Sequence, residues 1–303
     1  MIQEEHLKKE RLIVIDSNSI IHRAFHALPP LTTKSGELIN AVYGFLLFFF
    51  KVIRELHPDH IVACFDFPGR NFRHEQFKEY KAKRPKTPED LCTQIALVKD
   101  IIEKFNVVIL EKEGFEADDL IGTVVNLVQG DKEKRVEVFI LSSDNDVLQL
   151  VNPSTKVYSL KKGVKDTIIY DEKGVEEKYQ GLRPDQLIDY KALRGDPSDN
   201  IPGVKGIGEK GAIDLIKTFV SIENLYKELE EGSVKVQALK PRIKEILAQQ
   251  KKQAFFSKML VTIKKDVPID LTLEQCRWKG YNREKVINLF KDLGFLSLIE
   301  RLP

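Results

Sequence analysis

The first half of the chain alternates short apolar runs with longer segments in which apolar residues recur at helical spacing. The runs are continuously apolar or nearly so, as expected for strands buried on both faces of a sheet. The predicted strands are Leu12–Ile15, His60–Phe65, Val107–Leu110 and Val136–Leu141, with Lys156–Ser159 as a fifth candidate. The predicted helices are Asn40–Leu56, Pro88–Phe105, Ala117–Gln129 and Asp146–Val151. Strands that alternate with helices predict an α/β fold with a mainly parallel, twisted sheet flanked by helices.

From about Pro184 onward this strand pattern fades, and short helical segments broken by Gly and Pro take its place. We therefore expect an N-terminal extension over residues 1–10, an α/β core over 11–183 and a helical subdomain over 184–303. No flexible linker separates the two halves.

Acidic residues follow four of the predicted strands. Ligands of an open parallel sheet bind beyond the carboxyl ends of its strands, so these side chains are expected to converge there. A single acid in such a place is also the usual cap of the next helix. Three acids at the start of one helix, however, exceed what a cap requires. The seven residues are Asp16, Asp66, Glu116, Asp118, Asp119, Asp144 and Asp146.

A cluster of carboxylates predicts a bound cation, because the acids would otherwise repel one another at neutral pH. Oxygen ligands without a nearby Cys or His pair favour Mg²⁺, or Mn²⁺ as a substitute, over zinc. Two such ions about 4 Å apart are the arrangement used for phosphodiester hydrolysis. The pattern therefore indicates a nuclease. His22, His26 and His74 are interpreted as structural, since this chemistry requires no histidine.

A basic segment, residues 67–90, follows Asp66 directly. Between Arg70 and Lys86 it has seven basic and two acidic residues, a net charge of +5, with Phe72, Phe77 and Tyr80 interleaved. Cations that follow a backbone and aromatic rings that stack on bases are typical of single-strand binding. A solvated helix with inward-facing aromatic rings would have the same composition. The position of the basic segment beside the predicted metal site favours the interpretation that it binds a phosphodiester.

The run GVKGIGEKG, Gly203–Gly211, predicts a tight turn between two helices. Its order is not the dinucleotide-binding fingerprint, and a loop rather than a strand precedes it. Gly206, Gly208 and Ala212 fit a helix-hairpin-helix over about 200–217, in which backbone N–H groups face a phosphate. A plain turn is the alternative, but the lysines on the turn and the lysine-rich stretch 235–265 favour phosphate binding.

The composition of the 303 residues limits the class of protein and the cellular compartment that can be expected. The chain has 48 Lys and Arg against 46 Asp and Glu, 42% hydrophobic residues and a net charge of +2, which indicates a globular protein. Cys64, Cys92 and Cys276 show no metal-ligand spacing, and three scattered cysteines favour a reducing compartment. The longest apolar stretch is too short for a membrane span. We expect a cytoplasmic monomer.

Taken together, the motifs resemble the flap endonuclease family, and in particular the 5′ nuclease domain of bacterial DNA polymerase I. The resemblance runs from about Arg11 to the C-terminus, and the order and spacing of the motifs give it its specificity. They are VIDSNSIIHRAFHALPPLTT, AVYGF, FDFPGRNFRHEQFKEYKAKR, GFEADDLIGT, LSSDNDVLQLV and LRPDQLIDYKALRGDPSDNIPGVKGIGEKGA. The family fold is a PIN-like nuclease core with a helical DNA-binding region.

The resemblance also implies roles for individual residues. One metal would be held by Asp16, Asp66, Glu116 and Asp118, and the other by Asp144, Asp146 and Asp199. Asp119 and Asp196 would complete the site through water or a second layer of contacts. The basic segment would be a helical arch whose Arg73, Lys81 and Arg84 contact the reacting phosphate, with Tyr80 stacked on a base. The other DNA-binding residues would be Lys83, Gly203, Lys205, Gly206, Gly208 and Lys210, with K⁺ on carbonyls of the Gly turn.

The implied function is a Mg²⁺-dependent 5′ to 3′ exonuclease and flap endonuclease that acts on flapped, nicked or gapped DNA in replication and repair. The chain would be a free-standing nuclease or the front of a longer polymerase. A PIN-type ribonuclease and a non-catalytic DNA-junction binder remain alternatives. A phosphatase is disfavoured, because Asn18 stands where its second Asp is usual.

Overall fold

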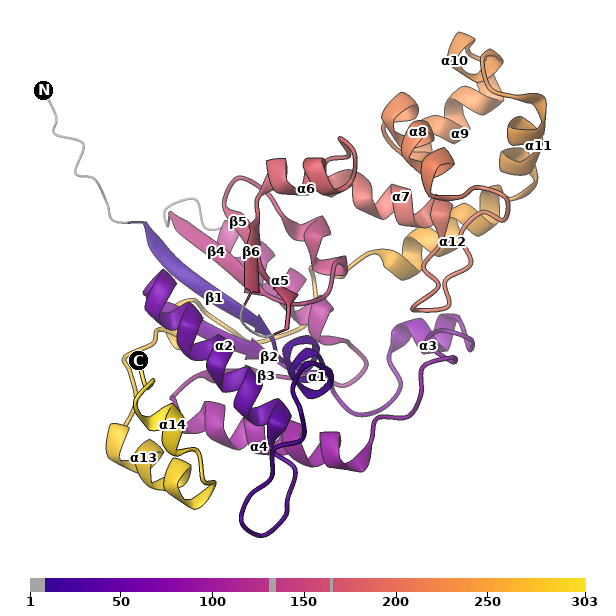
Figure 1. Ribbon diagram of the computed structural model, residues 1–303. Coiled ribbons are helices and arrows are strands. Elements are labelled where there is room, and N and C mark those ends of the chain that lie inside the picture. Colours follow the sequence, from indigo (N-terminus) through magenta and orange to yellow (C-terminus); the bar gives the residue numbers. More distant parts are fainter. Residues whose placement is uncertain (1–8, 131–134, 164–165) are drawn as a thin grey trace, which may run out of the picture.

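A computed structural model describes residues 9–130, 135–163 and 166–303, and six strands form one sheet in it (Figure 1). The predicted extension over residues 1–10 lies almost wholly outside this range. The strand order is β3-β2-β1-β4-β5-β6. The strands are β1 (Glu10–Asp16), β2 (His60–Cys64), β3 (Val108–Leu110), β4 (Val136–Leu141), β5 (Thr155–Lys162) and β6 (Asp166–Tyr170).

The first five strands are parallel, which confirms the mainly parallel sheet expected from the sequence. Two features differ from that expectation. Strand β6 was not predicted, and it pairs antiparallel with β5 at one edge. At the other edge β3 is only half-buried, because it has a neighbour on one side alone.

Helices cover both faces of this sheet (Figure 1). Residues of β1 alternate between the two faces: Leu12 and Val14 belong to one hydrophobic cluster, Ile13 and Ile15 to the other. Helix α5 (Ala117–Gly130) packs in the first cluster. Helices α2 (Asn40–Leu56) and α4 (Glu89–Lys104) pack in the second. The sheet therefore lies between two helical layers, with the carboxyl ends of its strands free to carry a site.

The helix predictions for α2, α4 and α5 agree with these bounds to within one or two residues. The predicted helix at 146–151 is instead a 3-10 turn, η1 (Asp146–Leu150). Helix α1 (Ser17–Ala27), which was not predicted, begins directly after β1 because the side chain of Asp16 caps it.

The basic segment is not the helical arch that the resemblance implies. It contains one short helix, α3 (Phe72–Gln76), followed by turns and a bend over residues 78–84 and by irregular chain up to the start of α4. Tertiary contacts explain this difference. The backbone of Lys81 takes a positive φ of 53°, and its N–H donates to the carbonyl of Asp199 at 2.9 Å rather than to a helical partner.

After β6 the described chain is helical, and the sequence predicted this from about Pro184 onward. Helices α8 to α11 extend away from the sheet (Figure 1), and α12 returns beside α7. The elements are α6 (Glu172–Lys178), η2 (Pro184–Gln186), α7 (Leu187–Arg194), α8 (Glu209–Phe219), α9 (Ile222–Glu231), α10 (Val234–Gln237), α11 (Pro241–Gln249), α12 (Lys251–Val261), η3 (Glu274–Cys276), α13 (Arg283–Asp292) and α14 (Leu296–Ile299).

The last part of the expected helical subdomain packs on the α/β core. The indole N–H of Trp278 donates to the carbonyl of Phe105 at 2.9 Å, and α13 and α14 join the hydrophobic cluster of α2 and α4. The boundary at residue 184 therefore does not separate two independent halves. Within the described residues, no helix is both long and apolar enough to cross a membrane.

We expect Gly211→Ala to raise the free energy of unfolding by about 0.5–1 kcal/mol, because alanine restricts the unfolded chain. Gly211 lies in α8, and the nearest atom to an added Cβ is Ile207 Cγ2 at 3.7 Å. Gly203→Ala is the contrasting variant, because its Cβ would lie 2.2 Å from the nitrogen of Gly195. Urea unfolding measures both variants, and a loss of stability in Gly211→Ala would contradict the expectation.

Candidate active site

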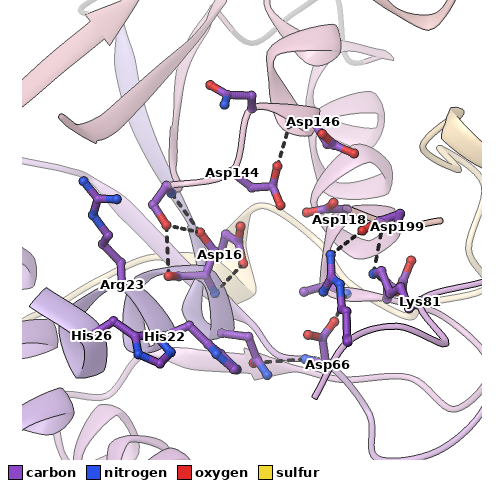
Figure 2. A pocket seen from close by; sticks show the side chains of 17 residues that line it. Asp16, His22, Arg23, His26, Asp66, Lys81, Asp118, Asp144, Asp146 and Asp199 are labelled. Atoms are coloured by element: carbon purple, nitrogen blue, oxygen red, sulfur yellow. Dashed lines mark hydrogen bonds and ion pairs between the residues drawn. The ribbon is translucent and has the colours of Figure 1, made fainter. Parts of the chain in front are cut away.

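An acidic pocket of about 450 Å³ lies at the carboxyl ends of β1, β2 and β4 (Figure 2). Six of the seven strand-end acids line it, and Asp199 joins them from the loop that connects α7 and α8. The lining acids are Asp16, Asp66, Glu116, Asp118, Asp144, Asp146 and Asp199. Of the nine residues implied by the resemblance, only Asp119 and Asp196 are absent from the lining.

Two of these acids also bond to the first turn of a helix, so helix capping and site formation coincide. Asp16 accepts a hydrogen bond from the N–H of Ser19 in α1 at 3.2 Å. Asp66 accepts one from the N–H of Ala117, the first residue of α5, at 2.8 Å. Such bonds hold the carboxylates at fixed positions around the pocket.

Asp144 and Asp146, two residues apart, lie in a turn after β4 rather than in a strand. The N–H of Asp146 donates to Oδ1 of Asp144 at 2.9 Å, and η1 begins there. Both side chains nevertheless line the pocket, and Figure 2 shows this bond between them.

The electrostatics of the pocket show an excess of negative charge. Burial, with the added repulsion of Asp144, raises the pKa of Asp16 to about 7. The same two causes raise the pKa of Asp146 to about 7. Burial and the charge of Asp16 also raise the pKa of Asp118. A cation among these groups would favour their ionised forms.

Three basic side chains supply part of the opposite charge. Lys81 forms ion pairs with Glu116 and Asp199, and Arg84 forms one with Asp199. Despite burial, the charge of Lys81 holds the pKa of Glu116 below its usual value. Lys191 of α7 forms a further ion pair with Asp146.

Asp196 lies behind the pocket lining, where it forms an ion pair with Lys191 at 2.7 Å. Although burial opposes ionisation, Lys191 and the hydrogen bonds from Ser198 hold the pKa of Asp196 at about 2. Asp196 is therefore placed to position Lys191, which in turn contacts Asp146.

Arg73 does not face the pocket, which differs from the phosphate contact that the resemblance implies. Its side chain is 3% exposed and donates two hydrogen bonds to Asp119, at 2.7 and 2.8 Å. Its Nε donates to the carbonyl of Leu260 and its Nη2 to that of Thr262. The guanidinium therefore joins the basic segment to the end of α12, and Asp119, which is fully buried, is its counterion.

Tyr80 is also buried, with 3% of its surface exposed, so its ring has no free face for a nucleobase. Its hydroxyl lies 2.9 Å from Oε2 of Glu116 and 3.1 Å from Oδ2 of Asp199. The stacking implied by the resemblance is not what this structure shows. Lys83, by contrast, is exposed on the same segment.

The donor set of the pocket fits a hard divalent cation, because seven of its lining residues offer carboxylate oxygens. In the described part of the chain, no three carboxylate, imidazole or thiolate groups converge in the arrangement of metal ligands. The reason is visible in the ion pairs: oxygens of Glu116, Asp146 and Asp199 face lysine or arginine side chains. Metal binding would require some of these oxygens to turn.

The Gly turn lies in the same α7–α8 connection as Asp199, so one loop links the pocket to the expected duplex-binding element. Gly203 is buried, whereas Lys205, Gly206, Gly208 and Lys210 are exposed. Gln250 holds the backbone of Lys205 on both sides, by accepting from its N–H at 2.8 Å and donating to its carbonyl at 2.9 Å.

The sequence reasoning missed some residues of the site. Lys191 carried no signal, because a single lysine in a helix has no distinctive spacing. His22, His26 and Arg23 of α1 line the pocket, although the two histidines were interpreted as structural. Their spacing of four residues on one helix face could have indicated this. His74 does have a structural role, as part of the cap of α3.

Comparisons with known proteins find relatives that match most of the chain. The model of the 5′-3′ exonuclease N-terminal resolvase-like domain matches residues 11–180, and that of the 5′-3′ exonuclease C-terminal SAM fold matches residues 182–284. The chain is 43% identical over 295 residues to DNA polymerase I of Bacillus subtilis, and 42% identical over 296 residues to DNA polymerase I of Caldicellulosiruptor bescii. The alignments cover 97% and 96% of this chain but 32% and 33% of those proteins, so it spans about a third of their length.

Solved structures share the fold. T5 5′-exonuclease with bound divalent metal ions (zinc) matches with a TM-score of 0.65 and 22% identity, over 83% of this chain and 89% of that one. The catalytic core of Rad2 in complex with DNA substrate matches with a TM-score of 0.57 and 18% identity, over 98% and 93% of the two chains. With both family models matched in order along most of its length, the chain belongs to the 5′-3′ exonuclease family.

Proposed function

We propose that this chain is a Mg²⁺-dependent, structure-specific 5′ nuclease that hydrolyses phosphodiesters of 5′ flaps and of nicked or gapped DNA. The observation that carries the proposal is the pocket itself: seven carboxylates line it, and Lys81 and Arg84 reach into it from the basic segment. Anionic groups would hold cations, and cationic groups would meet a phosphate. Few reactions other than phosphoryl transfer need both in one pocket.

Each set of residues has a role in this reaction. Asp16, Asp66, Glu116 and Asp118 would hold one divalent ion, and Asp144, Asp146 and Asp199 the other, with Asp119 and Asp196 behind them. Bound Mg²⁺, with Mn²⁺ as a substitute, supplies activation of water and stabilisation of the leaving oxygen. The products would carry a 5′-phosphate and a 3′-hydroxyl.

The basic side chains would act on the substrate. Lys81 and Arg84 line the pocket and would stabilise the charge that develops on the reacting phosphate. Arg73 would act at a distance, by holding the basic segment on α12 through its bonds to two backbone carbonyls.

Duplex DNA would bind along the Gly turn, with Lys205 and Lys210 exposed beside it and K⁺ on its carbonyls. The DNA substrate in the Rad2 structure and the metal ions in the T5 structure support this choice of ligands. The relatives named DNA polymerase I are about three times as long as this chain, so a polymerase region in the same or a separate chain is the partner we propose.

We expect the affinity for flap DNA to fall steeply with added salt. The chain has nearly equal numbers of acidic and basic residues, but seven acids are concentrated in the pocket, so the rest of the chain has an excess of basic residues. For about six phosphate contacts, the logarithm of affinity would fall with the logarithm of salt concentration with a slope of about −5. Fluorescence anisotropy with a labelled flap in EDTA measures this slope, and a flat response would contradict the expectation.

One set of substrates distinguishes the proposed nuclease from a PIN-type ribonuclease and from a non-catalytic junction binder. Matched flaps with a DNA or an RNA 5′ arm on the same DNA duplex are incubated with Mg²⁺ or with EDTA. The proposed nuclease cuts the DNA flap in Mg²⁺ only. Preferential cutting of the RNA arm would favour a PIN-type ribonuclease, and binding without cleavage in either buffer would favour a non-catalytic junction binder.

A further inference from the structure

We propose that residues 77–84 of the basic segment form a latch on the acidic pocket, and that divalent ions release it. The latch is bonded to the same carboxylate oxygens that the proposed ions require. Ion binding and release of the segment would therefore be coupled. This inference rests on the metal site of the proposed function and adds a means of regulating access to it.

The latch has three side-chain anchors, all on two acids. Tyr80 and Lys81 bond to both Glu116 and Asp199, and Arg84 bonds to Asp199. Glu116 and Asp199 are expected to serve different ions. The segment therefore connects a residue of one proposed ion site with a residue of the other.

Backbone contacts fasten the same segment to the loop that carries Asp199. The N–H of Lys81 donates to the carbonyl of Asp199 at 2.9 Å. The side-chain amide of Asn200 donates to the carbonyl of Glu79 at 2.7 Å. The latch thus closes on the α7–α8 connection, which also carries the Gly turn.

Glu116 shows why the latch and an ion compete. Its Oε2 accepts hydrogen bonds from Arg73 at 3.0 Å and Tyr80 at 2.9 Å, while its Oε1 accepts from Lys81. Both oxygens thus face a donor, and the positive charge of Lys81 beside Oε1 opposes a divalent ion at the same atom. Arg73 is fixed by Asp119 and by α12, and Tyr80 is buried, so the partner that can leave is Lys81.

The local backbone favours movement at this point. Residues 78–84 form turns and a bend rather than a helix or strand, and Lys81 has a positive φ of 53°, a conformation that residues other than glycine rarely adopt. The contacts of the latch maintain this conformation, and their loss would relieve it. Lys191, which contacts Asp146, differs because it belongs to the packed helix α7.

Coupling of this kind is reciprocal. If ions weaken the latch, then a substrate strand that draws Lys81 and Arg84 away from Asp199 must strengthen ion binding by the same factor. The pocket would then bind its full set of ions when the substrate is present.

Hydrogen exchange measured by mass spectrometry tests the release on the wild-type chain, with Ca²⁺ or Mg²⁺ and no DNA. We expect exchange in the peptide over 77–84, which includes the Lys81 amide, to accelerate about tenfold at saturating ion. Exchange in α5, which begins beside the pocket, should stay constant or slow down. Unchanged or slower exchange over 77–84 with the ion bound would overturn the latch.

Calorimetric titration of Lys81→Met with Mg²⁺ tests the competition directly. Lys83→Met is the matched control, because it removes the same charge from the same segment at an exposed position. We expect Lys81→Met to bind Mg²⁺ at least about fivefold more tightly than Lys83→Met. Equal affinities would overturn the latch but leave the metal site intact, whereas no ion binding by the wild-type chain would overturn both.

Discussion

Replacing Asp144 with asparagine lowers the rate of flap cleavage by about a thousandfold or more and leaves DNA affinity nearly unchanged. Asp144 lines the acidic pocket, and its Oδ1 accepts the N–H of Asp146 at 2.9 Å. Asparagine retains an oxygen for that bond, so the turn is preserved, but it removes the negative charge expected to hold an ion. A loss of about 4 kcal/mol of transition-state stabilisation corresponds to this factor.

Single-turnover cleavage and anisotropy on the same flap duplex measure the two effects. Asp185→Asn is the matched control, because it removes the same charge from an exposed residue paired with Arg183, outside the pocket. The control should cut at the wild-type rate. Cleavage by Asp144→Asn within tenfold of that rate would show that this carboxylate is not part of the catalytic pocket.

The second large effect is on stability: Arg73→Met should lower the free energy of unfolding by about 3–5 kcal/mol. Methionine keeps much of the length of the side chain but leaves Asp119 buried without its counterion. It also removes the donor to the carbonyls of Leu260 and Thr262. A buried charge without a partner is far more costly than a lost surface contact.

Urea unfolding monitored by circular dichroism provides the measurement. Arg183→Met serves as the control, because its ion pair with Asp185 is at the surface and should contribute at most about 1 kcal/mol. Adding Asp119→Asn to Arg73→Met should recover part of the loss, since the unpaired charge is then gone. A loss below about 1 kcal/mol in Arg73→Met would contradict the buried pair.

The sequence predicted the sheet and most of the pocket for one physical reason. Strands buried on both faces need continuous apolar runs, and the acids that follow those runs must lie at one edge of a parallel sheet. Asp16, Asp66 and Asp144 were found in this way. Asp199 was not, because it lies in a loop without periodicity, and only the family resemblance indicated it.

Other features depend on tertiary contacts that composition does not encode. The charge of the basic segment was evident, but the inward direction of Arg73 and Tyr80 depends on Asp119, Glu116 and α12. Strand β6 was missed because an edge strand that is only partly buried has no continuous apolar run. Its pairing with β5 follows from the short connection between the two strands rather than from a pattern within β6.

Whether the acidic pocket cuts DNA at a junction is tested most directly with a 5′-labelled flap duplex, incubated with the chain in Mg²⁺ and, in parallel, in EDTA. We predict a labelled product that ends near the junction and forms only with the metal. The absence of any metal-dependent product would contradict the assignment of this pocket as a 5′ nuclease site.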